Sequence, residues 1–368
     1  MRTAQVVAPV ALALATAVAA AGGWRLPTPV PTPARLDGTA TAQQPVCPPT
    51  PQSTPAGTLT QSACQLPAQE QTVLLPDAAD SRLVLANPDR VPAVVDLVLS
   101  GAKGPLTAAG TSSITVPAGG SREVPLMVQV PTGQAVAVQV RASSGRVAAW
   151  GSVVTTTGKR PHGADLAPST GASTHSVLPA LPAAEGHTLL VANPGDQRAT
   201  ATVLAHGSQG SFAPAGAGEV TVEPHQVLAL DVSSSFAGEP GALEVRSEDP
   251  LAVGSSSRKG KDFAFGAGSQ PATAQQLQVP GPSTLVLTNT EGAEAKVTLV
   301  GALGQELAVG PGQAVTVEVP KQGRLEVSST GPVGAALVLD RGGLAVQPAV
   351  ASSTSHSGGG LSRDPSLR

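Results

Sequence analysis

Three segments of the chain repeat one pattern, and this repetition constrains the fold more than any other feature of the sequence. Each copy opens with an apolar run that ends in asparagine, namely RLVLANP at 82–88, TLLVANP at 188–194 and TLVLTNT at 284–290. Asn87, Asn193 and Asn289 are the only asparagines in the chain. Asparagine closes turns with its side chain and tolerates unusual backbone angles, so we expect each one to fix a turn at a strand end.

The similarity continues downstream of each asparagine. A second apolar run follows, then two runs around a Pro- and Gly-containing turn, then two more runs joined by a tight turn. Apolar and polar residues alternate in these runs, which is typical of half-buried strands, and no helical period is present. The third copy lacks the stretch that matches the Gly-rich loops 101–110 and 207–218, so we expect it to have a trimmed edge.

These short strands predict an all-β fold. We expect three tandem immunoglobulin-like or fibronectin-like antiparallel β-sandwich modules, after an N-terminal signal or anchor helix and a Pro-rich linker. The Cys-Trp-Cys pattern of true immunoglobulin domains is absent. The alternative is a single pseudo-threefold structure whose copies share strands. The predicted signal peptide or anchor covers residues 1–23, and the linker covers residues 24–70. Modules one and two cover residues 71–162 and 172–264, and the shortened module three covers residues 276–348. A disordered tail is predicted over residues 349–368.

The N-terminus has the features of an export signal. Arg2 precedes an uncharged apolar run over 4–21 that contains small-residue cleavage sites. The run is barely long enough to span a bilayer and is rich in Ala, so we favour cleavage, with a membrane tether through residues 4–21 as the alternative. Either outcome places the protein outside the cytoplasm, secreted or anchored to the outer face of the membrane. The Pro-rich stretch 27–55 predicts an extended spacer.

Cys47 and Cys64 are the only cysteines. Two cysteines in an exported chain are expected to pair, and closing so short a loop contributes about 3 kcal/mol in the chain-entropy model. Free thiols or disulfides to a partner are the alternatives. No third sulfur or neighbouring histidine completes a metal site.

Composition narrows the class of partner. The net charge is −3, so no general field attracts nucleic acid or an anionic membrane. Aromatic residues make up 2% of the chain and tyrosine is absent, which argues against a carbohydrate-binding module because sugar rings pack on aromatic side chains. The core must be packed with Val, Leu and Ala.

Signatures of catalysis are missing from the sequence, including H-E-x-x-H, G-x-S-x-G and G-x-G-x-x-G. We interpret the histidines as surface loop residues, with a metal pair of His175 and His187 as a minor alternative. Asp77, Asp80 and Asp89 lie near strand ends and fit solvated turns better than a calcium site. We therefore expect no cofactor. The six histidines are His162, His175, His187, His206, His225 and His356.

The most basic stretch carries Arg258, Lys259 and Lys261, followed by Phe263 and Phe265. One hypothesis is a contact patch for an anionic polymer or a partner domain. The alternative, which we favour, is a solvated loop whose two phenylalanines are tucked under the next module.

The layout resembles an actinobacterial family of uncharacterised secreted proteins known only as a domain of unknown function. The resemblance covers residues 73–348 and rests on the exported start, the Pro-rich spacer and the elements L-V-L-x-N-P, V-x-A-G-G-S and V-R-x-S. It implies a location in the cell envelope and no particular chemistry.

The sequence therefore predicts a non-enzymatic envelope protein that acts as a scaffold or interaction surface for an envelope protein or polymer. Sheet edges can accept a partner strand, which gives such a surface a physical basis. Two alternatives remain, an accessory subunit of an envelope polysaccharide or glycosyltransferase system and a hydrolase with an unrecognised site. The hydrolase requires a polar cleft where His, Asp or Ser converge.

Overall fold

The computed structural model describes residues 45–48, 64–77, 81–126, 133–157, 160–341 and 343–352. These residues form 25 strands and one 3-10 turn, and all strand ladders are antiparallel, so the prediction of an all-β antiparallel fold is confirmed. In this part of the chain no helix has the length and apolar character needed to cross a membrane. The predicted signal or anchor segment 1–23, most of the linker and the tail beyond residue 352 lie outside the described residues.

The strands fall into three groups, one for each copy of the repeat, and ladders join strands of the same group. Module 1 contains β1 (Glu70–Leu75), β2 (Ser81–Ala86), β3 (Ala93–Gly101), β4 (Gly104–Leu106), β5 (Ile114–Val116), β6 (Ser121–Pro125), β7 (Val136–Ser144), β8 (Ala148–Thr157) and β9 (Arg160–Thr170). Module 2 contains β10 (Ser173–Leu181), β11 (Gly186–Ala192), β12 (Ala199–Gly207), β13 (Gly210–Phe212), β14 (Glu219–Val222), β15 (Val227–Asp231), the 3-10 turn (Ser233–Ser235), β16 (Gly241–Lys259) and β17 (Asp262–Ala267). Module 3 contains β18 (Ala272–Val279), β19 (Ser283–Thr288), β20 (Ala295–Gly301), β21 (Gln305–Val309), β22 (Ala314–Val319), β23 (Gly323–Asp340), β24 (Leu344–Pro348) and β25 (Val350–Ala351).

The ladders of each module join into one sheet of eight or nine strands, which folds over to form the two layers of a sandwich. In module 2 the first half of β16 pairs with β10 and β12, and its second half pairs with β11 and β17. The alternation seen in the sequence places one face of each strand inward: Ala199, Ala201 and Val203 of β12 are buried, whereas Thr200 is exposed. Each of the three modules has its own core of mainly Val, Leu and Ala, as the scarcity of aromatic residues predicts.

The module boundaries differ from the predicted ones. The ends predicted at residues 162 and 264 fall inside β9 and β17, which pair with the strands before them. Only residues 171–172 and 268–271 separate the strands of adjacent modules. Within β9, Pro161 pairs with Thr156 at an irregular point of the ladder, where a residue without a backbone N–H is tolerated.

The shortened third copy has a simple structural consequence. In modules 1 and 2, two short strands share the edge of β3 or β12, namely β4 with β5 and β13 with β14. In module 3 the single strand β21 runs along β20 from Ala295 to Leu299. One strand therefore replaces two where the loop is missing.

The three asparagines occupy equivalent buried turns, 0–2% exposed. In the second copy Asn193 Oδ1 accepts from the Gly195 backbone N–H at 2.9 Å, which closes the expected turn. Its Nδ2 donates to the Gln197 carbonyl at 2.7 Å and to the Val222 carbonyl at 3.0 Å, and so ties the turn to β14. Asn87 and Asn289 make the same three kinds of bond. The predicted local role of these residues is confirmed.

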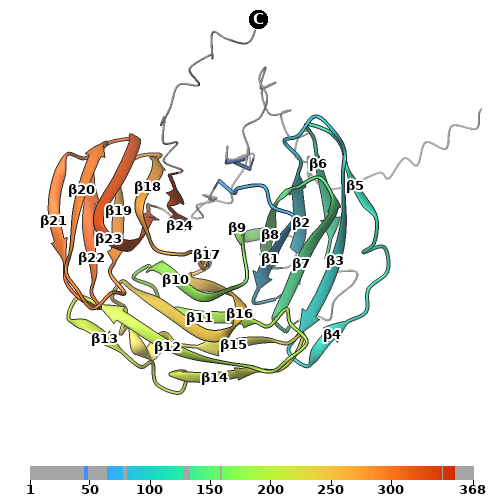
Figure 1. The fold of residues 1–368 in the computed structure, drawn as a ribbon, viewed down its shortest axis with the longest axis horizontal. Helices are drawn as coiled ribbons and strands as arrows, with labels where there is room; N and C mark the ends of the chain where they lie inside the picture. The colour runs from blue at the N-terminus through green and yellow to red at the C-terminus, as the bar shows by residue number, and fades with distance from the viewer. Residues whose placement is uncertain are drawn as a thin grey trace, which may run out of the picture.

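Figure 1 shows the modules arranged in an arc, with β9, β17 and β24 near its centre. Buried carboxylates link these central strands across modules. Asp165 of module 1 accepts from the Phe265 backbone N–H at 2.9 Å, and Asp262 of module 2 accepts from the Leu344 backbone N–H at 2.7 Å. The modules are therefore packed on one another and do not share strand ladders.

Candidate functional site

The most concentrated group of ionisable side chains lies at the junction of modules 2 and 3. Glu244, on β16, has a side chain that is 1% exposed. Its two carboxylate oxygens contact His175 Nε2 at 2.7 Å, His206 Nε2 at 3.1 Å and Arg246 Nε at 2.5 Å. A buried carboxylate needs such partners because the protein interior solvates charge poorly.

This group also bonds to module 3. His206 Nδ1 donates to the Gly312 carbonyl at 3.0 Å, and Arg246 Nη2 reaches the Thr290 carbonyl at 3.4 Å. Gly312 lies in the turn between β21 and β22, and Thr290 follows the third marker asparagine. The cluster therefore connects two modules through backbone carbonyls.

Hydrogen bonding fixes the charge of the cluster. Burial by itself raises the pKa of Glu244, but hydrogen bonds from His206 and Arg246, together with their charges, outweigh it and hold the pKa below its usual value. A carbonyl oxygen only accepts, so His206 Nδ1 carries a hydrogen. The His206 ring therefore lies between two oxygen partners, the Glu244 carboxylate and the Gly312 carbonyl.

The sequence did not single out this cluster. Glu244 occupies the same strand position as Gln139 in copy one and Glu326 in copy three. The available signal was an acidic residue between the core residues Leu243 and Val245, with two histidines elsewhere in the same copy. Nothing local indicates that this strand face meets another module.

A second buried histidine lies in module 2. The His187 side chain packs against Phe236 with ring centroids 5.5 Å apart, and its Nδ1 bonds to Ser257 Oγ at 2.9 Å. His187 and Ser257 are 2% and 1% exposed. The Asp231 carboxylate accepts from the hydroxyl and the backbone N–H of Ser233, and no hydrogen bond joins it to His187. This pair therefore lacks the solvent access and the orienting acid that a hydrolytic Ser-His arrangement requires.

The interpretation of the histidines as surface residues is wrong for His187 and His206, which are both buried. His175 and His187 contact different groups, so the alternative of a metal pair is not supported either. Within the described ranges no set of three or more ligating side chains is placed to hold a metal ion. His162 is in β9, and His356 and Asp80 lie outside the described residues.

The buried His187 gives stability a defined pH dependence. Burial lowers the pKa of His187 from 6.5 to about 4, so the folded protein keeps this ring neutral where the unfolded chain binds a proton. The contribution of the neutral His187 ring to the free energy of unfolding is complete above pH 6.5. It is lost as the pH falls toward 4, and the total loss is about 3 kcal/mol. Because the pKa of Glu244 is also lowered, protonation of this carboxylate at lower pH further decreases the free energy of unfolding.

Urea unfolding followed between pH 7 and 4 checks this expectation. The double variant His187→Leu with Ser257→Ala replaces the buried polar pair by apolar groups and should flatten the dependence between pH 6.5 and 4. His225→Gln changes a partly exposed histidine outside the buried pair and is the control. An unaltered slope in the double variant would contradict this assignment.

The basic stretch separates into two parts. Arg258, Lys259 and Lys261 are exposed, and Lys259 pairs with Asp340 of module 3. Phe263 and Phe265 are 8% and 2% exposed and belong to the core of module 1. The phenylalanines are therefore not available for a surface contact patch, and they pack under the preceding module instead of the next one.

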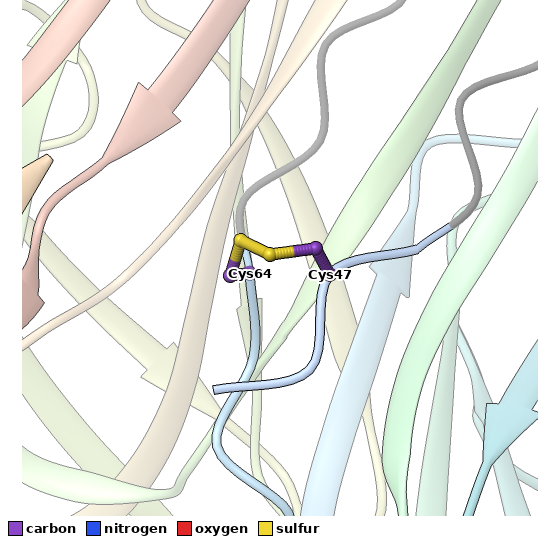
Figure 2. Close-up of a disulfide and its surroundings, with 2 residues drawn as sticks. All are labelled: Cys47 and Cys64. Carbon is purple, nitrogen blue, oxygen red and sulfur yellow. A yellow bond between two sulfur atoms is a disulfide. The ribbon is translucent and has the colours of Figure 1, made fainter. Parts of the chain in front are cut away.

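Cys47 and Cys64 form a disulfide, which confirms the predicted pairing (Figure 2). The residues beside it pair as well, because Val46 and Gln65 exchange backbone hydrogen bonds of 2.8 Å. Val46 also packs against the apolar cluster that contains Trp150. This part of the linker is attached to module 1 and is not an extended spacer.

The fold and these contacts define a class: an all-β protein of three joined sandwich modules with a disulfide-closed N-terminal segment. A family model described as a family of unknown function, DUF5719, matches residues 39–329, and the chain belongs to this family. The match includes the disulfide-closed segment. No curated protein matches the chain. No solved structure matches it either.

Proposed function

We propose that this chain is a non-enzymatic, extracytoplasmic protein of the cell envelope whose three modules form one body that serves as a scaffold or interaction surface. The main support for the proposal is that the buried charged groups form hydrogen bonds between modules. The Glu244 cluster bonds module 2 to module 3, and Asp165 and Asp262 accept backbone N–H groups across module junctions. Groups of this kind would line a cleft in an enzyme, and here they join modules.

Two further features support the proposed location. The signal-like segment over 4–21 provides a route out of the cytoplasm, and the Cys47–Cys64 disulfide is typical of oxidising compartments. The partner that we propose is another envelope protein or an envelope polymer. Exposed apolar side chains such as Phe212 and Val300 are candidate contact points on modules 2 and 3.

The location is tested by trapping the thiols of the chain in growing cells of its host with an alkylating reagent. The full chain should carry oxidised cysteines and fractionate outside the cytoplasm. A chain that lacks residues 4–21 should remain inside with both thiols alkylated. Reduced cysteines and a cytoplasmic location for both chains would overturn the proposed location.

The scaffold role is tested by a photo-crosslinking amino acid placed in intact cells at Phe212 or Val300, with the exposed position Glu318 as the matched control. We expect one discrete crosslinked species at an apolar position and none at the control. Recovery of monomer alone at every position would contradict an interaction surface on these modules.

A further inference from the structure

One sheet face recurs in all three modules, and the strand register identifies it. Val84, Leu190 and Val286 hold the same place in β2, β11 and β19, the strands that end at the marker asparagines. Across the ladder they pair with Trp150, Gly254 and Ala336. The same face continues onto the neighbouring strands β9, β17 and β24 through Leu166, Phe265 and Val346. We call it the entry face.

In module 2 the entry face is covered by module 1. Leu74 and Ala137 of module 1 pack with Leu190 and Ala252. The approach is close, since a Cβ on Gly254 would lie 3.2 Å from Leu74 Cδ1. A side chain at position 254 would therefore crowd the Leu74 side chain of the preceding module where it lies on the sheet.

In module 3 the entry face is covered by module 2 in the same way. Pro179 follows Leu178 as Leu74 follows Val73, and both core residues pair with equivalent partners. A Cβ on Gly334 would lie 3.0 Å from Pro179 Cβ. Val286 and Ala336 are buried in the cluster that includes Ala180 and Ala242 of module 2. The two junctions thus repeat one mode of docking.

Module 1 also has an entry face, and no other module precedes it among the residues that the structure describes. Its face is formed by Val84, Ala148, Trp150 and Leu166, and all four are buried, Trp150 completely. Val46 of the disulfide-closed segment packs on this cluster. The large Trp150 stands where the other modules have Gly or Ala, so its ring fills part of the volume that a whole module fills elsewhere.

Backbone and side-chain bonds hold the segment in this place. Beyond the Val46–Gln65 pair, Ala68 exchanges hydrogen bonds of 2.9 and 3.1 Å with Val147, the residue before β8. Ser169 on β9 donates to Gln65 Oε1 at 3.2 Å. The disulfide joins the two arms of the segment, so both are retained together.

We propose that the entry face of module 1 is a docking surface of the type that joins modules, and that its partner is the chain's own segment around Cys47–Cys64, which acts as an N-terminal cap. The cap keeps an apolar face containing Trp150 out of water. The disulfide restricts the conformations of the two arms when they are not docked, so less entropy is lost when they pack on the sheet. A small segment is therefore sufficient to cover this face.

The opposite end of the module array is closed differently. In module 3 the places of Leu74 and Ala137 are taken by Gln278 and Arg324, which are exposed. Arg324 pairs with Glu326 at 3.1 Å. A polar outer face of this kind ends a repeat array, since it offers no apolar surface to a further module. The described module array thus has a covered face on module 1 and a polar face on module 3.

The test uses the full chain with Trp24→Phe, which leaves Trp150 as the single tryptophan. Cys47→Ser with Cys64→Ser should shift Trp150 emission to the red and raise its quenching by acrylamide several-fold, while the far-ultraviolet circular dichroism of the sheets persists. Dithiothreitol, which becomes a cyclic disulfide as it reduces Cys47–Cys64 to two thiols, should produce the same change in the unmodified pair.

A second variant covers the case in which the double serine chain does not fold. Val46→Asp keeps the disulfide and places a charge against Trp150, and it should also increase quenching. Leu66→Asp is the matched control, because Leu66 lies in the same segment with its side chain 43% exposed, and it should have no effect. Unchanged shielding of Trp150 in folded protein after loss of the disulfide and in Val46→Asp would overturn the proposal.

Discussion

Glu244→Gln is expected to lower the free energy of unfolding by about 3 kcal/mol, because it removes the one negative charge among three nitrogen partners in a buried site. His206 would then face a neutral amide in place of a carboxylate, which weakens the contact that positions its ring against the Gly312 carbonyl. Urea unfolding at pH 7 measures the effect.

Glu326→Gln is the matched control, since Glu326 holds the same strand position in module 3 but is exposed and pairs with Arg324 on the surface. Its cost should stay within about 0.5 kcal/mol. Equal effects of the two substitutions would show that the Glu244 cluster does not stabilise the junction of modules 2 and 3.

Asn193→Ala should cost a comparable amount. The substitution leaves the Gln197 and Val222 carbonyls and the Gly195 N–H without their side-chain partner in a buried turn. Each such bond contributes about 1 kcal/mol and an unsatisfied buried group costs more, so we expect a loss of about 3 kcal/mol. Thermal and urea unfolding should both detect it.

The control for this substitution is Gln197→Ala. The bond from Asn193 goes to the backbone carbonyl of Gln197, and the Gln197 side chain is exposed. This variant should therefore keep the stability of the parent protein. A loss below about 0.5 kcal/mol in Asn193→Ala would instead mean that water replaces the side-chain amide in the turn.

Local features were predictable from the sequence. The alternation of apolar and polar residues in β12 predicts which face of the strand is buried. The three asparagines predict the turns, because a residue type that is absent elsewhere in the chain indicates a local backbone role. The disulfide followed from the expected compartment and the number of cysteines.

Features that depend on contacts between modules were not predictable. The strands β9 and β17 run past the module ends that the sequence predicts at residues 162 and 264, because their burial depends on contacts with the adjacent module. Glu244 is buried through contacts with module 3 that nothing in its own strand indicates. Trp150 lies on an outer sheet face beneath the cap, and no local pattern indicates this position.

The hydrogen bonds across both module junctions predict that the three modules form one body. Spin labels at Arg122→Cys in module 1 and Glu306→Cys in module 3 test it, since both side chains are exposed and the native cysteines are paired. Pulsed electron–electron double resonance should give one narrow distribution of distances between the two labels, and moderate salt should not change it. A broad distribution, as flexibly linked modules would produce, would contradict the packed arrangement.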